Sequence, residues 1–135
     1  MNDPNKIYAV WYPSVRRAGD ALVCGVQTKY NSVPFSFSFF KRIEDGNNIC
    51  TNQPATMVHE LFHAFGAAAP CATNYVSDVG SLRSAHVDDD PNDLMYSGNE
   101  FGIPLELDSG HDDYCVHNIP GCLDTADSPY LESQN

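Results

Sequence analysis

The segment TNQPATMVHELFHAFG, residues 51–66, constrains the fold of this chain more than any other stretch. Pro54 suits the first turn of a helix, and Thr51 and Asn52 before it are residues that cap helix starts. Gly66 is typical of the position where a helix ends. The segment therefore predicts one amphipathic helix. Its apolar stripe, predicted to pack on a sheet, has i, i+4, i+7 spacing and comprises Val58, Phe62 and Phe65.

Three segments ahead of this helix predict strands, at residues 6–12, 21–28 and 33–40. In the third, phenylalanines at 35, 37 and 39 alternate with serines, which predicts one apolar and one polar face. We therefore expect an α+β fold in which a small twisted sheet packs on this helix. The 135 residues fit a single domain with two lobes, 1–66 with the sheet and helix and 67–135 rich in loops.

The helix carries the spacing of a zinc site. His59 and His63 are four residues apart, so both imidazoles lie on one helix face and can reach one zinc ion. Glu60 points about 100° around the helix from His59, where it can act as a general base on water without binding the metal. The competing interpretation is that two histidines and a glutamate occur by coincidence on the surface of an amphipathic helix.

A catalytic zinc ion needs a third protein ligand and an open position. Our choice is His86, in the polar loop AHVDDDPNDLMY nine residues ahead of Met95. Three other side chains remain candidates for the third ligand: His111, His117 and Asp88.

HELFHAFG followed by NDLMYSG resembles the metzincin type of zinc metallopeptidase. More closely, HELFHAFGAAAP, AHVDDDPNDLMYSG, LDSGHDDYCVH and the residues Gly121, Cys122 and Asp124 are similar to small secreted bacterial proteins described as metallopeptidases, over about residues 55–124. Two positions depart from the metzincin pattern. Ala69 stands where the family has its third histidine, and Tyr96 directly follows the methionine instead of coming two positions after it.

The resemblance implies a secreted zinc endopeptidase with a zincin-like fold. His59, His63 and His86 would bind zinc, and Glu60 would be the general base for hydrolysis of a protein or peptide substrate. Met95 would form the apolar Met-turn beneath the metal ligands without binding zinc itself. The alternative from another class is a binding or adhesion module in which zinc or calcium only orders the loops.

Acidic residues concentrate in the second half of the chain. Residues 84–135 hold twelve acids and no Lys or Arg, whereas residues 1–58 hold four acids and six bases. Carboxylates suit calcium, but the spacing of this cluster does not match an EF-hand. Two interpretations stay open, a looser calcium site and a solvated acidic surface. The calcium ligands would be Asp88, Asp90 and Asp93, or alternatively Asp108, Asp112 and Asp113.

The composition also excludes classes of partner. A net charge of −11 disfavours nucleic acid and anionic membranes, and no apolar run is long enough to span a bilayer. Five cysteines without a Cys-x-x-Cys pair predict an exported protein with up to two disulfides, although this chain starts without a signal peptide. The pairing cannot be derived from spacing. We expect a monomer.

Overall fold

The computed structural model describes residues 6–14, 16–18, 21–39, 50, 53–78, 83–98 and 106–131. The chain divides into two compact units, Met1–Ala64 and Phe65–Asn135. Among the described residues, the first unit contains all of the strands and nearly all of the one α-helix. The coarse prediction of a small α+β fold is thereby confirmed.

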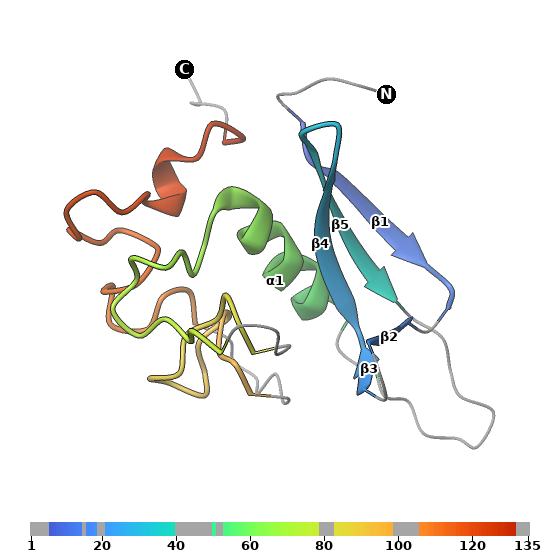
Figure 1. The fold of residues 1–135 in the computed structure, drawn as a ribbon, viewed down its shortest axis with the longest axis horizontal. Coiled ribbons are helices and arrows are strands. Elements are labelled where there is room, and N and C mark those ends of the chain that lie inside the picture. Colours follow the sequence, from blue (N-terminus) through green and yellow to red (C-terminus); the bar gives the residue numbers. More distant parts are fainter. Residues whose placement is uncertain are drawn as a thin grey trace. The chain divides into compact units, whose positions relative to one another are not determined.

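The first unit is built on a three-stranded sheet with the strand order β1-β5-β4 (Figure 1). Its central strand β5 (Val33–Phe39) pairs in parallel with β1 (Tyr8–Tyr12) and antiparallel with β4 (Gly25–Tyr30). Strands β2 (Arg16–Ala18) and β3 (Ala21–Val23) form a separate hairpin. The single strand predicted over residues 21–28 is thus interrupted at Cys24, and β2 lies in a stretch predicted to be a connection.

The serine face of β5 lies against the helix. Ser36 and Ser38 are fully buried, and the Ser36 hydroxyl donates a 2.9 Å hydrogen bond to the backbone carbonyl of Glu60 in the helix. On the opposite face, the rings of Phe35 and Phe37 are only half-buried and stack at 6.2 Å. A small hydroxyl side chain lets a helix backbone approach the sheet closely, so the polar face of this strand is the covered one.

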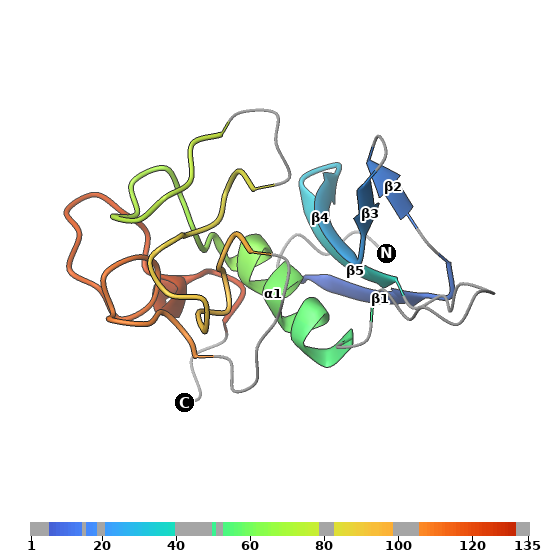
Figure 2. The same ribbon diagram turned by 90° about the horizontal axis from the view of Figure 1, so that it is seen from below.

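Helix α1 (Gln53–Phe65) lies alongside the sheet (Figure 2). It ends as predicted, because Gly66 follows it at a φ of 102°, a conformation that favours glycine. The predicted capping residues 51 and 52 lie outside the described residues. The predicted apolar stripe is wrong at Val58, which is 42% exposed. The helix instead buries a mixed face that comprises Ala55, Thr56, Met57, His59, Glu60 and Ala64.

The second unit consists mainly of loops. Apart from the last residue of α1, its described residues contain one helical turn, the 3-10 helix Thr125–Asp127, and isolated β-bridges. Val87 bridges both Tyr75 and Tyr96. Val87 and Met95 are fully buried, and Tyr114 is 1% exposed. Short backbone pairings and a few large buried side chains thus replace regular secondary structure.

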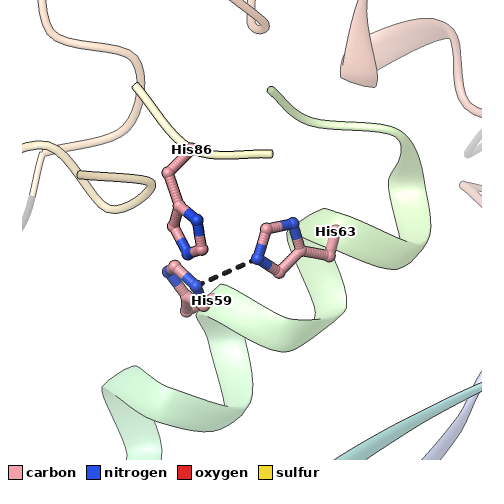
Figure 3. A group of neighbouring side chains, drawn as sticks. All are labelled: His59, His63 and His86. Atoms are coloured by element: carbon pink, nitrogen blue, oxygen red, sulfur yellow. Dashed lines mark hydrogen bonds between the residues drawn. The ribbon is translucent and has the colours of Figure 1, made fainter. Parts of the chain in front are cut away.

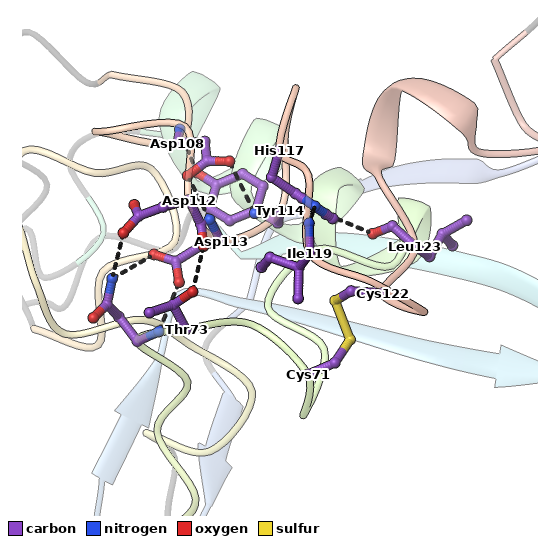
Figure 4. Close-up of a disulfide and its surroundings, with 11 residues drawn as sticks. Cys71, Thr73, Asp108, Asp112, Asp113, Tyr114, His117, Ile119, Cys122 and Leu123 are labelled. Atoms are coloured by element: carbon purple, nitrogen blue, oxygen red, sulfur yellow. Dashed lines mark hydrogen bonds between the residues drawn. A yellow bond between two sulfur atoms is a disulfide. The ribbon is translucent and has the colours of Figure 1, made fainter.

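Each unit contains one disulfide bond. Cys24 pairs with Cys50, and Cys71 pairs with Cys122, which joins residues 51 positions apart (Figure 4). Cys115 is a buried free thiol. Two disulfides indicate an oxidising environment for this protein. Among the described residues, no helix has the length and apolar character needed to cross a membrane.

Candidate metal centre

Two histidines on consecutive turns of α1 have ring nitrogens that converge. The Nε2 atoms of His59 and His63 are 3.1 Å apart, and the two rings lie edge to face with centroids at 4.7 Å. Two ligands bound to one zinc ion at about 2.05 Å would be this far apart when they make an angle of about 100° at the metal. The helix therefore holds this pair in a geometry that suits a shared metal ion.

His86 has a ring orientation set by its own loop. Its Nδ1 lies 3.0 Å from the carbonyl oxygen of Ser84 and 3.1 Å from that of Arg83. Both partners can only accept, so Nδ1 carries the proton and the lone pair of the ring is on Nε2. Burial also lowers the pKa of His86, which favours the neutral form that binds metals. A carbonyl partner on one ring nitrogen is typical of metal-binding histidines.

His59, His63 and His86 form a group that could hold a metal ion. One ligand atom from each residue lies within 4.8 Å of the other two (Figure 3). Three neutral imidazoles suit zinc and similar transition metals, whereas calcium and magnesium prefer oxygen ligands. The residues present therefore fit a zinc ion.

Glu60 lies against the sheet at the start of β4. It is 6% exposed, and its carboxylate accepts a backbone hydrogen bond from Gln27. Burial raises the pKa of Glu60 from 4.5 to about 8, while this hydrogen bond opposes the rise. A methyl group at Gly25 would lie 2.6 Å from Glu60 Cγ and 2.7 Å from Thr56 Cγ2, so the absence of a side chain at Gly25 makes room for the carboxylate. Glu60 is a buried carboxyl group that can exchange a proton near neutral pH.

Met95 is fully buried, and its backbone is hydrogen-bonded to the segment that carries His86. Its carbonyl oxygen accepts a 2.9 Å hydrogen bond from the backbone N–H of Val87, the residue after His86. The backbone carbonyl of His86 accepts from Val76 at 2.8 Å. Met95 thus occupies a buried position, and its backbone is paired with the residue next to a candidate ligand.

The other two candidate histidine ligands lie elsewhere. Both ring nitrogens of His117 are engaged, since Nδ1 accepts from the backbone N–H of Ile119 at 3.1 Å and Nε2 lies 3.3 Å from the carbonyl of Leu123 (Figure 4). His111 is exposed, with a φ of 55°. Among the described residues, neither histidine belongs to a group that could hold a metal ion, and Asp88 belongs to none either.

The acidic cluster is arranged differently from the sequence expectation. Asp88, Asp90 and Asp93 do not converge. The Asp93 oxygens accept from the backbone N–H groups of Met95 at 2.6 Å and Ser109 at 2.8 Å, so they are used within the fold. The carboxylates that do converge to within 4.8 Å belong to Asp89, Asp112 and Asp113.

This second acidic trio has protein partners of its own. Asp113 is fully buried, and its two oxygens accept from the backbone N–H of Asn74 at 2.7 Å and from the Asn74 side chain at 3.2 Å. Burial, and then repulsion from the neighbouring Asp89 and Asp112, raises the pKa of Asp113. The amide of Asn74 therefore supplies donors where a cation would otherwise be expected.

Sequence reasoning missed two features of the site. Gly25 and Ser36 let α1 approach the sheet, and only the alternation of serines with phenylalanines around Ser36 hinted at such a contact. The second feature is a buried network below Met95, formed by Asp93, Asp108 and Tyr114. Nothing in the spacing of these three residues predicts their contact.

No family model, curated protein or solved structure matches this chain.

Proposed function

We propose that this protein is a secreted zinc-dependent endopeptidase of metzincin-like type. The observation that carries the proposal is the convergence of His59, His63 and His86 to within 4.8 Å, with a buried glutamate directly following the first ligand in the chain. Three histidines and a carboxyl group that titrates near neutral pH are the components that metal-assisted hydrolysis requires. The two disulfides support an extracellular location.

In this proposal the three histidines hold the metal. A bound zinc ion would supply Lewis acidity, which polarises a carbonyl group and lowers the pKa of water. His86 contributes a neutral ring, because the carbonyls of Arg83 and Ser84 fix its proton on Nδ1. The Nε2 atoms of His59 and His63 are already placed 3.1 Å apart, so little rearrangement of the helix is needed.

Glu60 would move the protons of the reaction. Its carboxylate would accept a proton from the attacking water and return it to the amine that leaves when the peptide bond breaks. The pKa of about 8 lies close to neutral pH, where one group can both accept and donate. The backbone N–H of Gln27 and the space above Gly25 orient the carboxylate.

Glu60→Gln tests this assignment. The amide has nearly the same size as the carboxyl group but cannot accept the proton, so zinc content should stay at one ion per chain while cleavage of a denatured protein substrate is lost. The measurements are metal analysis and a chelator-sensitive cleavage assay. Val58→Ala, on the exposed side of α1, is the control and should retain both properties. Normal cleavage by Glu60→Gln would exclude Glu60 as the base.

The alternative of a metal-stabilised binding module has one observation in its favour. The second unit has few regular elements among its described residues, so a metal ion bound by His86 could serve to order its loops. Zinc binding that raises the thermal midpoint, together with no turnover of a broad peptide library, would support the module. Zinc-dependent turnover supports the peptidase.

A further inference from the structure

The segment that carries His86 is fixed by a ladder of backbone hydrogen bonds. The Val87 N–H donates to the Met95 carbonyl at 2.9 Å, and the Ser97 N–H donates to the Val87 carbonyl at 2.8 Å. Val87 and Met95 are both fully buried. A displacement of Met95 would therefore displace Val87, and with it the neighbouring His86.

Met95 is in turn fixed by one buried carboxylate. Asp93, which is 1% exposed, accepts the Met95 N–H on Oδ1 at 2.6 Å. The same oxygen accepts the Tyr114 hydroxyl at 2.8 Å, and Oδ2 accepts the Ser109 N–H at 2.8 Å. A carboxylate buried among such neutral donors keeps its position only while they satisfy it.

Tyr114 connects this carboxylate to a second loop. Its hydroxyl donates to Asp93 and accepts the Asp108 N–H at 2.9 Å, and its side chain is 1% exposed. The Asp108 carboxylate accepts the backbone N–H groups of Tyr114, at 2.8 Å, and of Cys115. The tyrosine hydroxyl therefore links the loop before Met95 to the loop after Glu106 by hydrogen bonds.

We infer that Tyr114 is a positioning residue for the metal centre, acting through Asp93 and Met95 on the orientation of His86. This inference rests on the proposed metal site. Loss of the hydroxyl removes one donor from the buried Asp93 and the acceptor of the Asp108 N–H. The Met95 segment then loses its fixed position, although Tyr114 never contacts the metal.

Tyr114→Phe is the test, with zinc affinity and the visible absorption of the cobalt-substituted protein as readouts. We expect zinc affinity to fall by about 10-fold, the low end of the range for groups that bond a metal ligand directly, because Tyr114 acts through intervening residues. The cobalt bands should shift, because they report the geometry of the ligands. A purely structural hydroxyl would change neither once the protein is folded.

Thr125→Val is the matched control. It also removes one fully buried hydroxyl from this unit, the 2.8 Å bond to the Tyr114 carbonyl, but it leaves Asp93 and Met95 untouched. Both variants are compared at a temperature where circular dichroism shows each of them folded. Zinc affinity and cobalt bands should be unchanged in Thr125→Val.

Asp93→Asn provides a second variant that keeps the shape of the side chain. In one orientation the new NH2 group faces the Ser109 N–H, and in the other it faces the Met95 N–H and the Tyr114 hydroxyl. Either way a donor meets a donor, so Asp93→Asn should weaken zinc binding as well. The inference is overturned if Tyr114→Phe binds zinc with unchanged affinity and spectrum, or if Thr125→Val is impaired equally. A wild-type protein that binds no zinc would instead refute the proposed function at its base.

Discussion

His59 and His63 face each other across one turn of α1, with 3.1 Å between their Nε2 atoms. In the proposed zinc site, both rings are ligands. Replacing either one by Ala should lower zinc affinity by more than the roughly 100-fold that the loss of an outer-shell partner costs. Competition with a chromophoric chelator measures this. Equal affinity in His63→Ala and wild type would mean that the pair is not a metal site.

His86→Ala should cause a comparable loss of zinc, because it removes the third ring of the group. The matched controls are His111→Ala and His117→Ala, which change the same residue type in the same unit. Both should bind zinc like the wild type, since neither histidine belongs to the group. A loss of zinc confined to one of these controls would assign the third ligand to that residue.

Gly25→Ala should destabilise the first unit and reduce activity. The added methyl group would collide with the Glu60 side chain and with Thr56 Cγ2 at 2.7 Å, and such overpacking costs about 1–3 kcal/mol. Urea unfolding gives the change in the free energy of unfolding. In a Glu60→Ala background the collision with Glu60 is removed, so the same substitution should cost less. Identical costs in both backgrounds would show that the two residues are not in contact.

The stability of the metal-free protein should fall as the pH rises from about 4.5 to about 8 because of Glu60. Its pKa is about 8 in the folded protein and 4.5 for an ordinary glutamate, so the folded state binds the extra proton between these values. This contribution is complete below pH 4.5 and is lost as the pH passes 8, with a slope of at most about 1.4 kcal/mol per pH unit.

Glu60→Gln isolates this effect, since the amide does not titrate. Urea unfolding of both proteins across the pH range, with a chelator present, should give a difference in unfolding free energy that changes steadily in favour of Glu60→Gln as the pH rises. A difference that is constant with pH would show that the Glu60 pKa is not raised.

The disulfide pattern leaves one free thiol, which is buried. Cys115 is buried, so it should react with a thiol reagent only after unfolding, and the four remaining cysteines only after reduction. Fast labelling of the native protein would contradict the assignment of Cys115 as the buried thiol.

Replacing Cys71 and Cys122 together by Ser should lower the free energy of unfolding by about 2–5 kcal/mol, because this bond closes a loop in a unit with few regular elements.

Local sequence signals were sufficient for the helix. Pro54, the spacing of the two histidines and Gly66 predicted both its extent and the face that carries His59 and His63, because these depend only on neighbouring residues and on helix periodicity. The same periodicity failed for Val58, which is exposed. Which side of a helix is buried depends on what packs there.

Alternation in β5 predicted a strand but not which of its faces is covered. The residues Ser36 and Ser38 lie beneath α1, since small side chains permit close approach of the helix, and that preference is set by the partner element.

The sequence by itself determined one helix with a pair of histidines on one face, a small sheet and a cysteine-rich, acidic second half. Tertiary structure decided which cysteines pair, that His86 joins the helix pair while His111 and His117 do not, and that Asp93 binds Met95 and Tyr114. The physical reason is range. Helix periodicity and caps act over a few residues. Contacts between loops that are distant in sequence form only when the intervening chain closes a long loop, and no local pattern encodes which loops close.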